Sequence, residues 1–266
     1  MSSRERRLVF DEVAELYARV RPGYPDALID RVLECASERG PASRMLEIGC
    51  GGGQATKAFA SHGLSIVALE PGHNLAHYAH EQLDAVCPDN SQVEIVVTTF
   101  EDYALPREPF DLVISAQAFH WLDPVLRFRK SAEALRPGGV LAIFGNKPSH
   151  TSDPVYREID AAYAECAPSM RANPPERDSC LAGDYPIAQE FAQASQFGAL
   201  CQHAYPWSQR YSADDYVALM QTQSNHRMLP PAELDALLER IHAAIEASGG
   251  SVPIPYVAHL AMGRRR

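Results

Sequence analysis

The stretch MLEIGCGGGQAT, residues 45–56, decides the fold. A short apolar run ends at Ile48, four glycines follow within five residues, and a helical pattern begins at Gln54. Glycines at such a turn permit positive φ angles and let the backbone approach a ligand closely. The helix start adds unpaired N–H groups and the positive end of a dipole. The stretch therefore predicts a ligand site at a strand-to-helix turn of an α/β sheet.

The spacing of these glycines separates the classes of ligand. A dinucleotide fingerprint G-x-G-x-x-G that starts at Gly49 needs its third glycine at position 54, which is Gln54. No Gly-Lys-Ser/Thr follows, so the phosphate-binding P-loop pattern is also missing. The stretch instead reads E-x-G-x-G-x-G from Glu47 to Gly53, which favours an adenosine cofactor without phosphates. A tight turn that binds no ligand is the other interpretation.

Composition narrows the function classes. The chain has 266 residues and a formal net charge of -10, opposite in sign to most proteins that track a nucleic-acid backbone. Its six cysteines include no C-x-x-C pair, so no zinc site is indicated. The charged N-terminus does not resemble a signal peptide, and no apolar run reaches membrane-spanning length. We expect a cytoplasmic protein with no metal, nucleic-acid or membrane partner.

Apolar runs alternate with helical patterns in the first half of the chain. The runs are RMLEI (44–48), SIVALE (65–70), VEIVVT (93–98), FDLVIS (110–115) and VLAIFG (140–145). This alternation predicts a mostly parallel sheet with helices on both faces. RPGG (136–139) predicts a tight turn before the fifth run. Two later runs, 197–207 and 255–263, alternate enough to be strands.

The alternation stops after Gly145. Residues 146–195 contain six prolines and several helical pieces, which is typical of an insertion rather than of another strand–helix unit. We therefore expect a single domain with an embedded lid. Its expected parts are N-terminal cap helices (1–40), a cofactor-binding core (41–145), a lid insertion (146–195) and C-terminal strands and helices (196–266).

Five motifs in order resemble the core of class I S-adenosylmethionine-dependent methyltransferases of the small-molecule kind. They are LEIGCGGG (46–53), SIVALEP (65–71), TTFEDYAL (98–105), FDLVISAQAFHW (110–121) and LRPGGVLAIF (135–144). Flanking segments 10–25 and 208–226 also resemble bacterial members, nearest the trans-aconitate type. The resemblance implies S-adenosyl-L-methionine as cofactor. It also implies a Rossmann-like, doubly wound α/β sheet of seven strands, mostly parallel with an antiparallel last strand.

The resemblance assigns cofactor contacts to the strand ends. Glu70 would accept hydrogen bonds from the ribose hydroxyls, where the family often has aspartate, and Phe100 would pack on adenine or belong to the core. Gly49 and Gly51 would let the methionyl part lie on the backbone. The full expected set is Tyr17, Arg21, Glu47, Gly49, Gly51, Glu70, Pro71, Thr99, Phe100, Glu101, Ala116 and Gln117.

The N-terminal stretch adds a possible cover for this site. If residues 9–20 form a helix, Tyr17 and Arg21 share one face at four-residue spacing. They would close over the cofactor, with Arg21 near its carboxylate. A plain surface arginine is the alternative.

His120 is the candidate general base, because its unperturbed pKa lies near neutrality and it follows the fourth apolar run. It would otherwise bond the cofactor or only shape the pocket. Trp121 would pack there or present its aromatic face to the sulfonium. The expected substrate contacts are Tyr24, His120, Trp121, Tyr185, Trp207 and His226.

The expected function is transfer of a methyl group to a small molecule by in-line displacement, in a monomer or homodimer. An NAD(P)-dependent Rossmann oxidoreductase is the alternative enzyme class, disfavoured by Gln54. A cofactor-binding protein without turnover is the non-enzyme alternative. The sequence identifies neither the acceptor nor the element that is methylated.

Overall fold

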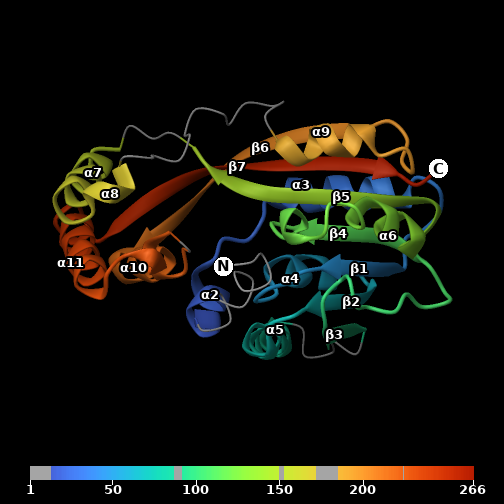
Figure 1. Cartoon of the computed structure of the whole chain (residues 1–266), viewed down its shortest axis with the longest axis horizontal. Helices are drawn as coiled ribbons and strands as arrows, with labels where there is room; N and C mark the ends of the chain where they lie inside the picture. Colours follow the sequence, from blue (N-terminus) through green and yellow to red (C-terminus); the bar gives the residue numbers. More distant parts are fainter. Residues whose placement is uncertain (1–12, 87–91, 150–152, 172–184, 224) are drawn as a thin grey trace.

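The computed structural model describes residues 13–86, 92–149, 153–171, 185–223 and 225–266, and it contains one sheet of seven strands in the order β3-β2-β1-β4-β5-β7-β6 (Figure 1). The strands are β1 (Arg44–Ile48), β2 (Ser65–Glu70), β3 (Val93–Val97), β4 (Phe110–Ala116), β5 (Leu135–Pro148), β6 (Cys201–Ser212) and β7 (Ser251–Arg264). The pairs among β1 to β5 are parallel, and β7 is antiparallel to both of its neighbours. The predicted Rossmann-like sheet with an antiparallel last strand is confirmed.

The strand bounds agree best where a strand is short and buried. β1 and β2 begin and end at the predicted residues. β5 begins at Leu135, so RPGG lies inside the strand, and the prediction of a separate turn there was wrong. The chain accommodates these residues by a register irregularity opposite Phe110 and Leu112 and by a φ of +78° at Gly138.

Helices cover both faces of the sheet. They are α2 (Ala14–Val20), α3 (Asp26–Ser37), α4 (Gln54–Ala60), α5 (His73–Val86), α6 (Arg127–Ala134), α7 (Val155–Cys166), α8 (Pro168–Arg171), α9 (Pro186–Gln193), α10 (Ala213–Gln221), α11 (Pro231–Ala247) and the short 3-10 turns η2 (Phe119–Trp121) and η3 (His226–Met228). Adjacent strand residues point to opposite faces. Met45 therefore packs with α3, α4 and α5, whereas Leu46 packs with α6 and α9.

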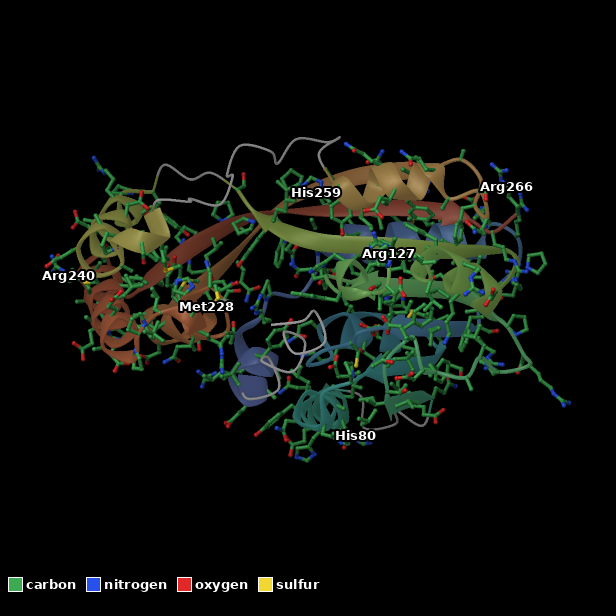
Figure 2. All side chains as sticks on the ribbon, viewed as in Figure 1. His80, Arg127, Met228, Arg240, His259 and Arg266 are labelled. Carbon is green, nitrogen blue, oxygen red and sulfur yellow. The ribbon has the colours of Figure 1, made fainter. Side chains whose placement is uncertain are left out.

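The strands β5, β7 and β6 continue past the other four and carry a second group of helices at their far end (Figure 1). We call α7, α8, α10 and α11 the helical cluster. Its core joins Ile159, Leu219 and Ile241 to Val252 of β7 and to Val20 of α2. Met228 and Arg240 lie at this cluster, whereas Arg127 lies at the main sheet, at a distance from both (Figure 2).

The segment 146–195, expected as one lid, is divided between the two regions. Helices α7 and α8 belong to the helical cluster, whereas Phe191 of α9 packs in the core of the main sheet. Residues 150–152 and 172–184 of this segment lie outside the described part. The lid therefore stays a prediction, and only α7 and α8 are placed away from the sheet.

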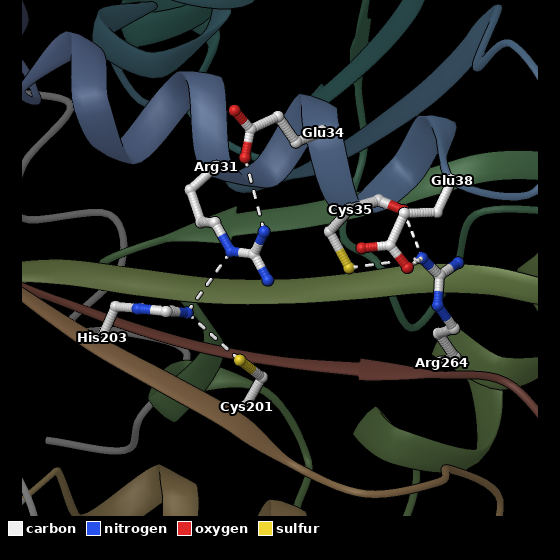
Figure 3. A network of polar contacts seen from close by, with 7 residues as sticks. All are labelled: Arg31, Glu34, Cys35, Glu38, Cys201, His203 and Arg264. Atoms are coloured by element: carbon white, nitrogen blue, oxygen red, sulfur yellow. Dashed lines mark hydrogen bonds and ion pairs between the residues drawn. The ribbon is translucent and has the colours of Figure 1, made fainter.

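Polar contacts attach α3 to the outer strands (Figure 3). Arg264 of β7 donates from Nη2 to Glu38 Oε2 at 2.7 Å and also contacts the carbonyl of Cys35. On β6, His203 Nε2 lies 3.4 Å from Arg31 Nε of α3 and 3.1 Å from Cys201 Sγ. The contacts of Arg264 and His203 hold α3 against β7 and β6, away from the cavity described below. Within the described residues, no helix is long and apolar enough to cross a membrane.

Candidate active site

A cavity of about 230 Å³ lies at the carboxyl ends of β1, β2 and β4. Ile48, Glu70 and Ala116, which lie at the ends of these strands, contribute to its wall. The strand order reverses between β1 and β4, and open α/β sheets bind ligands at such a crossover. A second hollow of about 30 Å³ adjoins it and shares Tyr17, Gly49 and Gln117 as lining residues.

The glycine turn lines both spaces. Gly49 has a φ of +72°, and a Cβ there would stand 2.5 Å from the Cβ of Ala118. Gly51 has a φ of +56° and also faces the cavity. The amides of Gly49 and Cys50 donate to the carbonyl of Leu69 at 2.9 and 3.0 Å, which ties the turn to the end of β2. Only glycine combines these angles with so close an approach.

Glu70 presents a carboxylate whose direction is fixed by the backbone. Its side chain is buried, Oε2 accepts a hydrogen bond from the Gly51 amide at 2.9 Å, and Oε1 accepts one from the Gly72 amide at 2.9 Å. Pro71 lines the cavity beside it. A carboxylate has about four acceptor positions on its two oxygens, so backbone amides and a ligand hydroxyl can bind it together.

Glu47 is fully buried beneath the glycine turn. Oε2 accepts a hydrogen bond from Thr56 Oγ1 at 2.7 Å, whereas Oε1 has no hydrogen-bond partner among the described residues. Burial raises the pKa of Glu47 to about 7, and the charge of Glu70 contributes in the same direction. Glu47 is among the residues that line the smaller hollow, and its unpartnered Oε1 is buried beside that hollow.

The segment after β3 contributes Thr99 and Phe100 to the cavity wall, and Phe100 is at the same time part of the buried core. Glu101 is not among the lining residues. Its Oε1 accepts a hydrogen bond from the Asp123 amide at 3.2 Å, and its carbonyl accepts one from Lys130 at 2.9 Å. The contact of Glu101 with a ligand stays a prediction, and in this structure its side chain is bonded to the loop that precedes α6.

Gln117 closes the end of β4 in a strained backbone conformation. Its φ of +53° is the only positive value of a non-glycine residue in the described part. The side-chain amide donates to the carbonyl of Asn146 at 3.1 Å, and Oε1 accepts from the Tyr24 hydroxyl at 3.4 Å. Gln117 lines both spaces, while Tyr24 lines only the smaller one.

Tyr17 and Arg21 lie on one face at the end of α2, at the expected four-residue spacing. Arg21 is the C-terminal cap of α2, and its amide donates to the carbonyl of Tyr17 at 3.1 Å. The Arg21 guanidinium lies 4.7 Å from the centre of the Tyr17 ring, a cation–π distance. Both residues line the cavity.

His120 and Trp121 form the rim of the cavity in η2. The two rings lie 4.8 Å apart between centres. Desolvation lowers the pKa of His120, and the Arg127 guanidinium contributes in the same direction. A neutral imidazole at this rim can accept a proton from a ligand.

Three expected substrate contacts do not line the cavity. The Tyr185 ring stacks on His259, with 5.7 Å between ring centres. Trp207 donates from Nε1 to Asn146 Oδ1 at 2.9 Å. His226 is buried, its Nε2 lies 2.6 Å from the Tyr163 hydroxyl, and burial lowers its pKa to about 4. These side chains are engaged in packing, the usual role of aromatic and histidine residues inside a fold.

Sequence reasoning missed several lining residues. Leu69 and Thr98 lie at strand ends and follow from the same rule that located Glu70. Gln223 also lines the cavity, but it follows α10, more than 100 residues along the chain from Gln117. No local pattern around Gln223 indicates this contact.

Comparison with known proteins extends this description. Residues 46–143 match the family model described as a methyltransferase domain. An uncharacterized methyltransferase of Mycobacterium tuberculosis is 28% identical over 262 residues, which cover 96% of this chain and 95% of the relative. A methyltransferase-like protein of Schizosaccharomyces pombe is 25% identical over 89% of this chain and 84% of its own.

Solved structures share the fold. A protein of Anaeromyxobacter dehalogenans, proposed to be a type II methyltransferase, superposes with a TM-score of 0.59 at 23% identity, over 92% of this chain and 97% of that one. Phosphoethanolamine N-methyltransferase 2 of Haemonchus contortus, solved with phosphomonomethylethanolamine and S-adenosylhomocysteine, superposes with a TM-score of 0.54 at 16% identity, over all of this chain and 60% of that one. At these identities the structures establish the shared fold alone.

Proposed function

We propose that this chain, a member of the class I methyltransferases, binds S-adenosylmethionine in the cavity and transfers its methyl group to a small-molecule acceptor by in-line displacement. One observation carries the proposal. The carboxylate of Glu70 is oriented by two backbone amides at the end of β2, in the same cavity as the E-x-G-x-G-x-G turn. A ribose can bind such a carboxylate through both hydroxyls.

The chemistry of the donor groups fits this cofactor. Glu70 would hold the ribose, and Thr99 and Phe100 would border the adenine. The unmet Oε1 of Glu47 fits the ammonium group of the methionyl part, which supplies N–H donors and a positive charge. Arg21 would face the methionyl carboxylate. Bound S-adenosylmethionine supplies an activated methyl group on a sulfonium.

The remaining residues would align the acceptor. Gln117, at the end of β4, would border the transferred methyl, and the His120 imidazole at the rim would take a proton from an acceptor that carries one. Positioning of this kind can contribute roughly 7–11 kcal/mol in the best intramolecular models. His120 would accept the proton, and the residues of the cavity wall would position the acceptor in line with the methyl group.

A nicotinamide dinucleotide fits this turn less well. Gln54 stands where the third glycine of the dinucleotide fingerprint belongs. Its Nε2 donates to the carbonyls of Tyr17 and Ala18 at 3.3 and 3.2 Å, which holds α2 against the turn. A pyrophosphate would have to displace this contact, whereas a cofactor without phosphates would not.

The same proposal covers the finer expectations from the sequence. We propose a single domain with residues 146–195 as an insertion, a cytoplasmic location, and a monomer or homodimer. The acceptor is a small molecule of unassigned class. None of the related proteins reported above is a trans-aconitate methyltransferase, so the resemblance to that type stays a prediction.

Calorimetry on the purified chain tests the proposal. S-adenosylhomocysteine should bind and NAD should not, and Glu70→Ala should weaken binding by about 1–3 kcal/mol, the range for a lost charge-assisted hydrogen bond. Glu101→Ala is the matched control, because Glu101 lies outside the cavity and should leave the affinity unchanged. Binding of NAD with no heat from S-adenosylhomocysteine would contradict the proposal. Turnover is checked by mass detection of methylated products from a panel of small molecules.

A further inference from the structure

The contact between Arg21 and Thr222 joins the cavity to the helical cluster. Arg21 Nε donates to Thr222 Oγ1 at 3.0 Å, and Arg21 Nη2 donates to the Thr222 carbonyl at 2.7 Å. Thr222 is fully buried and lies 201 residues from Arg21 along the chain. A guanidinium held at two atoms by one residue is restricted in direction as well as in position.

The donor and acceptor roles in this contact follow from the neighbouring bonds. The Thr222 hydroxyl donates to the carbonyl of Leu219 at 2.7 Å, so its oxygen accepts from Arg21. Thr222 is the C-terminal cap of α10, and the carbonyls at a helix C-terminus carry partial negative charge that favours a cation. Both atoms of Thr222 are therefore suited to a guanidinium.

The same contact arranges two walls of the cavity. Arg21 lies beside the Tyr17 ring on one side, and Gln223 follows Thr222 directly and lines the cavity on the other. A second contact joins α2 to α10: Arg19 and Asp215 form an ion pair at 3.7 Å. This pair is exposed, and neither residue lines the cavity. The Thr222 contact is thus the buried one of the two.

We infer that Thr222 is a positioning residue that aims Arg21 at the amino-acid end of the cofactor. The inference rests on the proposed function. It gives the helical cluster a part in cofactor binding, although the cluster lies at a distance from the glycine turn. Removing the hydroxyl leaves Arg21 with one anchor, so the guanidinium gains freedom that binding must then restrict.

The test uses two ligands that differ in the amino-acid end. S-adenosylhomocysteine contains that end, whereas 5′-methylthioadenosine has the same nucleoside and a sulfur but no carboxylate or ammonium. Thr222→Val removes the acceptor and keeps the shape, and it should weaken S-adenosylhomocysteine about ten-fold, the order expected for a hydrogen bond to a charged group. The affinity for 5′-methylthioadenosine should stay within about two-fold of wild type.

Matched variants separate positioning from general damage. Thr222→Ser keeps the hydroxyl and should restore the wild-type affinity, and Asp215→Asn breaks the exposed link between the same helices and should change neither ligand. In an Arg21→Ala background, Thr222→Val should cause no further loss, because a residue that acts through another is non-additive with it. If the Thr222→Val variant does not fold, Thr222→Ala takes its place in the test, because it removes the same oxygen.

The outcomes distinguish this inference from the proposed function. Equal losses for both ligands, or full additivity with Arg21→Ala, would overturn the positioning role. Wild-type affinity in Thr222→Val would overturn it as well, while the proposed function would stand. If the wild-type chain binds neither ligand, the proposed function itself fails.

Discussion

The glycine-turn region and the helical cluster are built in opposite ways. The cavity wall between Ile48 and Leu122 comes largely from short segments that each follow a strand, so one stretch of sequence supplies each piece. The core of the helical cluster joins Val20, Ile159, Leu219, Ile241 and Val252, which are far apart in the chain. The first region can therefore be predicted from local sequence patterns. The second depends on contacts between distant segments, which form only in the folded chain.

Two histidines illustrate the difference. Desolvation lowers the pKa of both His120 and His226. His120 stands at the rim of a cavity, so its free nitrogen can meet a ligand. His226 is buried in the cluster against Tyr163 and meets only protein. A shifted pKa alone does not identify a catalytic group; access to a cavity separates the two.

The largest expected effect is the loss of turnover when His120, at the rim of the cavity, is replaced. His120→Ala should lower turnover by about 10²–10⁴-fold with little change in cofactor affinity, the range for a lost general base. Because the pKa of His120 is lowered, the wild-type rate should rise with pH through a value below 6.5 and stay level above it. Steady-state rates across pH check this. If the acceptor needs no base, the variant should instead weaken acceptor binding and keep the pH profile.

A second effect concerns the glycine turn. Gly51→Val should reduce S-adenosylhomocysteine affinity by about 100-fold or more, because a branched side chain is strained at positive φ and fills the cavity. Gly63→Val is the control, since Gly63 also has a positive φ but has nothing within 4 Å of its Cβ position. Calorimetry and thermal melting measure both variants. Similar affinity losses in the two would point to backbone strain rather than to the cavity.

A smaller effect concerns the protonation of Glu47. Its pKa of about 7 in the free protein should fall when an ammonium group binds, so binding releases a proton below pH 7. The affinity for S-adenosylhomocysteine should therefore fall by up to about ten-fold per pH unit as pH drops below 7. Glu47→Gln should remove this dependence. Calorimetry in buffers of different ionisation heat counts the protons, and an equal slope in the variant would exclude Glu47 as their source.

The smallest effect on the cavity is expected from the core of the cluster. Ile241→Ala should lower the free energy of unfolding by about 2–5 kcal/mol, because Ile241 is fully buried. In the folded variant, S-adenosylhomocysteine affinity should stay within about two-fold, since Ile241 does not line the cavity. Denaturant unfolding and calorimetry provide the two numbers. A large loss of affinity in the folded variant would show that the two regions are coupled more widely than through Thr222.

Much of the first region could be predicted because its signals are periodic. β1 and β2 match their predicted bounds, since buried parallel strands are continuous apolar runs between turn residues. Glu70 could be assigned to the cavity wall because it ends such a strand. The side-chain position of Glu101 could not be predicted from the sequence, since its contact with the Asp123 amide depends on how the loop before α6 folds.

Predictions for the second half were weaker for a physical reason. Trp207, Tyr185 and His226 have residue types common in binding sites, but the same types pack in cores, and only the fold decides which. The division of residues 146–195 between two regions depends on whether Phe191 finds a complementary surface, and it does so on the main sheet.

The sequence by itself determined the class of sheet, the position of the cavity at the glycine turn, and the carboxylates beside it. These follow from periodicity, from glycine at positive φ and from the rule that ligands bind at carboxyl strand ends. Only the tertiary structure decided that Arg21 is held by Thr222 and that Gln223 enters the cavity wall. Such contacts join segments some 200 residues apart, and the long-range packing that selects them leaves no local pattern in the chain.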